Sequence, residues 1–180
     1  LPVDDDSVIA FDDSGMRSAL NYINYIRHDP TNYSDSTGIN MSFFESAPQL
    51  VMNDTLNEVA YQKAKDMIRR GYFSHTDPDG KGINIKLHEQ GYTLPDEWIA
   101  SIELNYFESI DAGLAGDEYY AREFVNRLIR DENSETKENR KRILGIGEFN
   151  ADMTEFGAAI ARSPGSEHEN YFVLIIAKHN

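Results

Sequence analysis

One histidine of this chain stands in a setting that suggests chemistry. His75 lies in RRGYFSHTDPDGKG, Arg69 to Gly82, where a helical pattern ends and a turn rich in Asp, Pro and Gly begins. An imidazole at such a place can hold a metal ion, transfer a proton, or only form a hydrogen bond within a packed loop. On residue type alone the packed loop is the simplest interpretation, and all three roles stay open.

Two alternative sites next to His75 fail on their spacing. In the calcium-binding register of an EF-hand, DPDGKG would place Lys81 and His88 where an oxygen ligand and a glutamate are required. Ser74 adjoins His75, but residues adjacent in sequence rarely present a nucleophile and its base to each other, and no GxSxG elbow is present. We therefore predict a tight turn over 77–80 and no serine nucleophile.

Composition excludes several classes of function. The chain has 180 residues, 40% of them hydrophobic, which is typical of one globular domain. Its net charge of −14 disfavours binding to nucleic-acid phosphates and to anionic lipid headgroups. Without cysteine, the chain has no disulfide, thiolate zinc site or cysteine nucleophile. No apolar run approaches the roughly 20 residues that span a bilayer, so we expect no transmembrane segment.

Helical patterns come first along the chain and strand patterns come late. Apolar residues recur at helical spacing over about 14–27, 55–70, 83–90 and 117–131. Alternation over Ala100 to Phe107 predicts a strand, and 154–162 with 170–179 predict a hairpin around the turn SPGSEHE. This order predicts an α+β fold. We assign residues 1–13 to an N-terminal tail and 14–180 to a single domain.

Taken in order, these segments resemble the CAP superfamily, which is named after cysteine-rich secretory proteins, antigen 5 and plant pathogenesis-related proteins. The nearest likeness is to its cysteine-free bacterial branch. The resemblance covers roughly 19–177 and is carried by NYIR, QLVMNDTLNEVAYQKAKDM, GYFSHTDPDG, LHEQGY and the final TEFGAAIA…NYFVLIIA. It implies a three-layer α-β-α sandwich with a small antiparallel sheet between helices. It also implies an extracellular or cell-envelope location, and a start at Leu1 without Met would fit removal of a signal segment.

The resemblance also implies a site. In that family a surface cleft collects two histidines and two glutamates, and many members bind zinc or another divalent cation there. His75 corresponds to the first histidine, Glu103 in SIELN to the glutamate of the family's GENI segment, and Glu155 in TEFG to the second glutamate. Asn139 stands where the HR-x-x-I-L segment of the family has its second histidine. An amide oxygen is a poorer zinc ligand than an imidazole, so we expect weak binding of a divalent cation such as zinc by His75, Glu103 and Glu155.

These inferences lead to a ranked prediction of function. We predict a secreted or cell-envelope binding module whose cleft, around His75, Glu103, Asn139 and Glu155, holds a small molecule, lipid or peptide without turnover. The alternative is a hydrolase in which His75 is the general base or the sole imidazole ligand and the two glutamates assist. A third possibility is a structural domain in which these side chains only pack.

Overall fold

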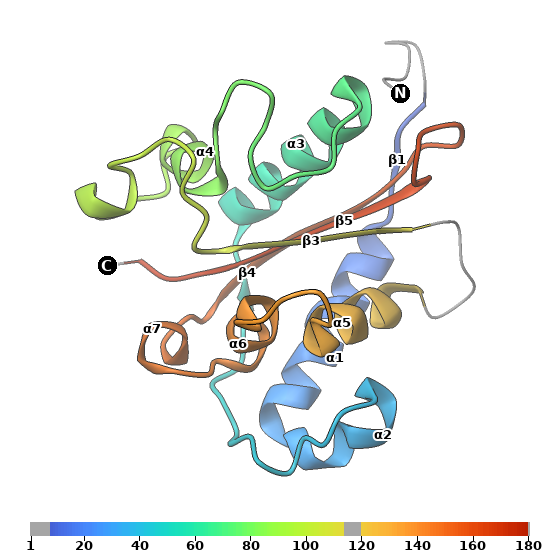
Figure 1. The fold of residues 1–180 in the computed structure, drawn as a ribbon, viewed down its shortest axis with the longest axis vertical. Helices are drawn as coiled ribbons and strands as arrows, with labels where there is room; N and C mark the ends of the chain where they lie inside the picture. The colour runs from blue at the N-terminus through green and yellow to red at the C-terminus, as the bar shows by residue number, and fades with distance from the viewer. Residues whose placement is uncertain (1–7, 114–119, 180) are drawn as a thin grey trace.

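The computed structural model describes residues 8–113 and 120–179. The longer helices are α1 (Asp13–His28), α3 (Asp54–Arg70), α4 (Ile83–Glu89), α5 (Tyr120–Arg130) and α6 (Glu138–Leu144), and the shorter ones are η1 (Pro30–Tyr33), α2 (Ser34–Thr37), η2 (Asp96–Trp98) and α7 (Glu148–Ala151). The strands are β1 (Ala10–Phe11), β2 (Val51–Met52), β3 (Glu108–Gly113), β4 (Glu155–Arg162) and β5 (Asn170–Ala177). Figure 1 shows α3 and α4 on one side of the sheet and α1, α5 and α6 on the other. The predicted α+β class and layering are confirmed.

The β4–β5 hairpin forms the middle of the sheet. The order of the main path is β1-β4-β5-β3, and β2 pairs with β4 off this path. β3 and β4 both run antiparallel to β5, whereas β2 runs parallel to β4. Among the described strands β3 has β5 as its one neighbour and is therefore an edge strand. Because β1 pairs with β4, residues 10–11 of the predicted tail belong to the sheet.

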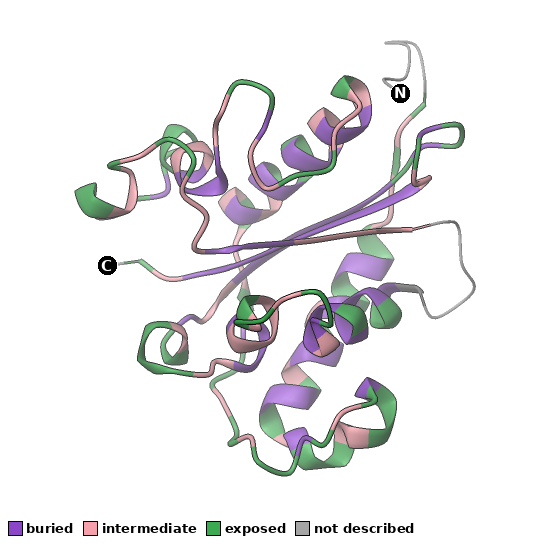
Figure 2. Cartoon of the chain, viewed as in Figure 1, coloured by how far each residue is buried: buried purple, intermediate pink, exposed green. Residues whose placement is uncertain are grey.

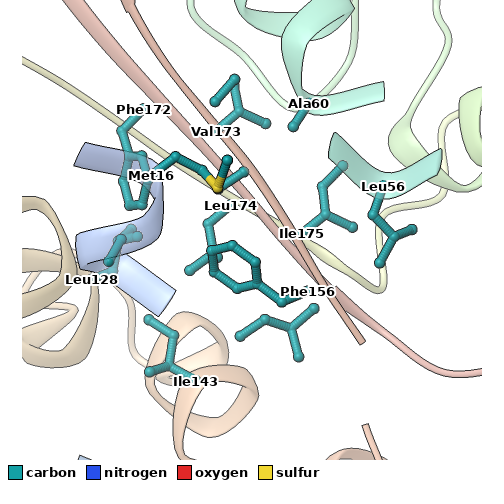
Figure 3. Close-up of a cluster of buried hydrophobic side chains, with 14 of the residues drawn as sticks. Met16, Leu56, Ala60, Leu128, Ile143, Phe156, Phe172, Val173, Leu174 and Ile175 are labelled. Carbon is teal, nitrogen blue, oxygen red and sulfur yellow. The ribbon is translucent and has the colours of Figure 1, made fainter. Parts of the chain in front are cut away.

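The core lies on both faces of this hairpin. All eight residues of β5 are buried. Phe172 faces α5, where its ring stacks on Phe124 with centroids 5.3 Å apart. Ile175 points to the opposite face, beside Leu56 of α3 (Figure 3). Alternate side chains of a strand point to opposite faces, so a continuous apolar run such as YFVLIIA needs a helical layer on each side.

The helices bury the sides that face the sheet and expose the others (Figure 2). α3 begins at Asn53, whose side chain accepts hydrogen bonds from the backbone N–H groups of Thr55 and Leu56. It ends at Gly71, whose left-handed backbone (φ 64°) turns the chain toward His75. None of the helices in the described ranges has the length and apolar character needed to cross a membrane.

The strand predicted over Ala100 to Phe107 is wrong, because β3 begins only at Glu108. The carbonyl groups of Ile102 and Leu104 accept hydrogen bonds from the backbone N–H groups of Gly82 and Asn84, at the start of α4. A Cβ atom on Gly82 would lie 2.4 Å from the Leu104 carbonyl oxygen, so only glycine allows this approach. The alternating residues therefore form a loop that pairs with a helix terminus.

A glycine on β4 tests how closely α3 packs on the sheet. A Cβ atom on Gly157 would lie 2.3 Å from the backbone and the Cβ of Leu56. We expect Gly157→Ala to lower the free energy of unfolding by about 1–3 kcal/mol, because the helix has to move away. Urea denaturation measures this change. Gly113→Ala is the control, since its Cβ would come no closer than 3.4 Å to Arg127, and an equal loss in both variants would contradict the packing.

Candidate functional site

His75 is paired with a buried glutamate. Its Nδ1 lies 2.8 Å from Oε1 of Glu108, the first residue of β3. The Glu108 side chain is fully buried, whereas that of His75 is 43% exposed. When the Glu108 carboxylate is ionised it can only accept, and Nδ1 of His75 is then the donor of this hydrogen bond. The other nitrogen of the ring, Nε2, is then an acceptor that has no hydrogen-bond partner within residues 8–113 and 120–179.

A buried lysine fixes the backbone of this histidine. Nζ of Lys63, on α3, donates to the carbonyl groups of Ser74 and His75 at 2.8 and 3.1 Å. Lys63 is 1% exposed. Burial lowers the pKa of its ammonium group, and the negative charge of nearby Glu108 opposes that effect. The Lys63 ammonium group therefore attaches the loop that carries His75 to α3, and two carbonyl groups of that loop solvate the cation.

The turn after His75 supplies a second support. The Asp77 carboxylate accepts hydrogen bonds from the backbone N–H groups of Asp79 and Lys81 and from the Lys86 ammonium. Burial raises the pKa of Asp77, but these three donors outweigh it, so that the pKa lies below its usual value. Gly80 has a left-handed backbone (φ 83°), and its N–H donates to the Asp77 carbonyl group. The tight turn predicted over 77–80 is confirmed.

Glu108 is held by side chains as well as by the sheet. Its backbone N–H donates to Asn105 Oδ1, and its carbonyl group accepts from Nη1 of Arg142 at 2.9 Å. Arg142, on α6, also donates to the Tyr106 carbonyl group and the Ser109 hydroxyl. Burial lowers the pKa of Arg142 to about 10, although Glu108 acts in the opposite direction. A buried carboxylate therefore lies beside two buried cations, Lys63 and Arg142, which offset its desolvation.

Asn139 is used for structure. Its Nδ2 donates to Oδ1 of Asp131, and its backbone N–H donates to Oδ2 of the same carboxylate, both at 2.9 Å. Its Oδ1 accepts a longer bond, 3.4 Å, from Arg142 Nη1. The amide thus connects the end of α5 to the arginine that holds Glu108. Asn139 is the residue that stands in place of the family's second histidine. Both polar atoms of its side chain therefore already have hydrogen-bond partners.

These residues line a cavity of about 390 Å³, which we call the His75 pocket. The rings of Tyr106 and Phe149 meet edge to face there, with centroids 5.7 Å apart, and form an aromatic wall. Glu108 Oε2 is buried and has no hydrogen-bond partner in the described part of the chain. The full lining is His75, Asn105, Tyr106, Glu108, Ser134, Glu138, Asn139, Arg142, Phe149 and Asn150.

The structure does not bring Glu103 to His75. Glu103 lies in the exposed loop before β3, and its carboxylate accepts a hydrogen bond from the Ser101 hydroxyl. That bond lowers the pKa of the carboxyl group. Five residues further on, Glu108 occupies the place beside the imidazole that was predicted for Glu103. The reason is the boundary of β3, since the loop that carries Glu103 pairs with α4 and not with the sheet.

Glu155 belongs to a second cluster. It starts β4, and its carboxylate accepts hydrogen bonds from Asn53 Nδ2 and from the hydroxyl of Tyr92. His179 Nε2 lies 3.3 Å from Glu155 Oε2, and the His179 ring stacks on Tyr92 with centroids 4.2 Å apart. Burial and the negative carboxylate both raise the pKa of Tyr92. Within the described residues Glu155 is not part of the His75 pocket.

The predicted metal ligands therefore do not form a set. Across residues 8–113 and 120–179, no group of three or more His, Asp and Glu side chains is placed to hold a metal ion. His75 and Glu108 provide two potential metal ligands. The Asn139 amide beside them is hydrogen-bonded to Asp131 and Arg142. Zinc sites in proteins use three or four protein ligands. The residues present do not fit a resident zinc ion.

Glu108 could have been found in the sequence. The family's GENI segment has an isoleucine two residues after its glutamate, and Glu108 with Ile110 keeps that spacing. Glu103 is followed at the same distance by Asn105, which does not. Arg142 gave no comparable signal, because its role depends on α6 packing against the start of β3.

Comparison with known proteins identifies the family. The model of the Cysteine-rich secretory protein family, CAP, matches residues 20–176. This chain belongs to the CAP family. Its lack of cysteine is consistent with the cysteine-free branch that the sequence resembles. No curated protein matched this chain.

Two solved structures are similar to this chain. An outer surface protein from Borrelia burgdorferi is similar over 97% of this chain and 99% of its own, with a TM-score of 0.64 and 16% identity. A cysteine-rich secretory protein from Staphylococcus aureus has 14% identity and a TM-score of 0.48 and covers 92% of this chain and 38% of its own. At these identities the likeness to the Borrelia protein shows the fold alone.

Zinc titration tests the separation of the predicted ligands. We expect the chelator-stripped protein to bind zinc more weakly than a Kd of about 1 μM, which corresponds to about −8 kcal/mol. The reason is that Glu103 and Glu155 lie away from His75. Calorimetry on the wild type, Glu103→Gln and Glu155→Gln should give the same weak isotherm. Tight binding that disappears in Glu155→Gln would show that the predicted set assembles.

Proposed function

We propose that this CAP domain is a secreted or cell-envelope binding module that holds its ligand in the His75 pocket without turnover. The observation that carries the proposal is the pairing of a half-exposed imidazole with a fully buried carboxylate on the wall of a cavity of about 390 Å³. A polar pair fixed beside an aromatic wall is the usual composition of a ligand site. The family, and the likeness to a protein described as an outer surface protein, support the location.

The lining indicates what kind of ligand fits. With a proton on Nδ1, the neutral His75 ring leaves Nε2 as a hydrogen-bond acceptor at the surface of the pocket. Glu108 Oε2 is buried behind it and has no hydrogen-bond partner among the described residues. Tyr106 and Phe149 offer apolar faces. The pocket therefore suits a group that has both hydrogen-bond donors and an apolar surface, such as a small molecule or the side chain of a peptide.

A hydrolase is the second candidate, and one observation favours it. The hydrogen bond from Nδ1 to Glu108 orients His75 so that Nε2 could take a proton from water, which is the arrangement of a general base. A covalent mechanism has no support, because within the described residues the His75 ring is hydrogen-bonded to Glu108 and to no serine or threonine hydroxyl, and binding therefore ranks first. The Ser134 hydroxyl of the pocket accepts from the Lys137 backbone N–H and lies 3.5 Å from that of Thr136. A metal-assisted hydrolase would need a group of metal ligands, and the residues that the structure describes contain no such group.

A fragment screen by ligand-observed NMR tests the proposal. We expect fragments with donors and an aromatic or aliphatic face to bind the wild type and to be recovered unchanged. His75→Ala should weaken them about tenfold or more, because the acceptor is lost, and Glu103→Gln should leave them unaffected as a matched surface control. Fragments that bind His75→Ala equally well would refute the site. Hydrolysis of peptide or ester substrates that His75→Ala abolishes would favour the second candidate.

A further inference from the structure

The outer edge of β3 runs along the His75 pocket. The Phe107 carbonyl group accepts from the Ile176 N–H at 3.1 Å, and the register places Glu108 opposite Ile175. In an antiparallel pair, successive residues direct their peptide groups alternately toward and away from the partner strand. Phe107 therefore faces β5, while Glu108 and Ile110 direct their N–H and C=O groups away from the sheet.

One residue on this edge lacks partners. Side chains of Asn105 and Arg142 occupy the outward groups of Glu108, and the Asp111 carboxylate accepts from the N–H of Ala112. For Ile110, between them, neither outward group has a hydrogen-bond partner among the described residues. Ile110 thus offers one donor and one acceptor in the geometry that an added strand requires.

Two cavities lie along this edge, and we call the two together the groove. A second cavity of about 390 Å³ adjoins the His75 pocket, and the two share Asn139. Its lining includes Phe73 from the loop after α3, Arg127 and Asn139 from α5 and α6, and Ile110 and Asp111 from β3. Because Ile110 is only partly exposed between these elements, the groove suits a single extended chain and not the broad surface of a second copy.

The exposed charge of this groove is acidic. The side chains of Glu132 and Glu138, which line the two cavities, are 78% and 55% exposed. Each forms an ion pair at the surface, Glu132 with Arg130 at 3.8 Å and Glu138 with Lys141 at 3.0 Å. Such exposed pairs are weak and leave the carboxylates open to a further cation. The guanidinium groups there are engaged, since Arg127 pairs with Asp111 and Arg142 is buried among oxygen acceptors. Arg130, which also lines the second cavity, pairs with Glu123 and Glu132. A net charge of −14 for the whole chain has the same sign. A basic partner is therefore favoured electrostatically.

We propose that the ligand of this CAP domain is an extended, basic peptide segment that adds to the edge of β3 at Ile110 and places alternate side chains in the two cavities. This inference rests on the proposed binding function and names the class of ligand. The backbone pairing with Ile110 provides the register. Glu132 and Glu138, whose exposed ion pairs with Arg130 and Lys141 are weak, attract lysine or arginine. The His75 pocket accepts one side chain.

The test uses an end-capped, fluorescent peptide of alternating lysine and valine, with binding to the full chain measured by anisotropy. We expect at least about tenfold weaker binding, or 1.4 kcal/mol, when glutamate replaces lysine and when the peptide backbone is N-methylated. Glu138→Gln should weaken the lysine peptide several-fold, and Glu103→Gln should not. Hydrogen exchange of backbone amides, followed by NMR, shows where the peptide backbone pairs. The peptide should slow exchange of the Ile110 amide at least about tenfold.

Each of the other outcomes contradicts a different part of the proposal. Binding that leaves exchange at Ile110 unchanged, or that tolerates N-methylation, would overturn edge pairing while the binding function stands. No binding of the lysine peptide, or equal binding of the glutamate peptide, would overturn the basic-peptide ligand, and fragment binding at His75 would then show whether the binding function survives. Protection of Ile110 by dimerisation without peptide would replace the peptide with a second copy of the chain.

Discussion

Strand β5 is buried along all eight of its residues, and this burial dictates the arrangement of the other elements. A strand without a polar face has to be covered on both sides, so α3 packs on one face and α1 and α5 on the other (Figure 1). Gly157 allows α3 to lie directly on β4. With both faces covered, the sheet ends at its edge strands, and the His75 pocket lies along the edge formed by β3.

The second requirement is electrostatic. Placing Glu108 fully inside this layered structure removes its carboxylate from water, which is costly unless opposite charge and donors are nearby. His75 donates to it directly, while Lys63 and Arg142 contribute positive charge from α3 and α6. The same contacts hold the histidine loop and the start of β3 together. The contacts around Glu108 therefore also connect the two helical layers to the sheet.

Sequence patterns predicted the parts of the fold that are long and locally encoded. The terminal hairpin and the helix ending at Gly71 were found because their periodicity and stop signal are unambiguous. The segment from Ala100 to Phe107 was mistaken for a strand, since alternation does not reveal that its carbonyl groups pair with the start of α4. Glu103 was assigned from the likeness of SIELN to the family's GENI segment, whereas the structure places Glu108 beside His75.

The candidate site was predicted only in part. His75 and Asn139 do line one pocket, whereas Glu155 lies in a separate cluster with Tyr92. The function of Asn139 was not visible in sequence, because it depends on the tertiary placement of Asp131 beside α6. A residue that replaces a family histidine suggested a weakened metal site. In the structure the amide at that position organises hydrogen bonds that a histidine could not reproduce in the same way.

The central claim is that Glu108 fixes His75 within the site, and the protonation of the imidazole ring tests it most directly. Long-range ¹H–¹⁵N NMR at alkaline pH, where the ring is neutral, distinguishes the two tautomers. We predict a protonated Nδ1 and an unprotonated Nε2, with a large change in Glu108→Ala and none in Glu103→Ala. A ring protonated at Nε2, or ring resonances that respond to Glu103 and not to Glu108, would contradict it.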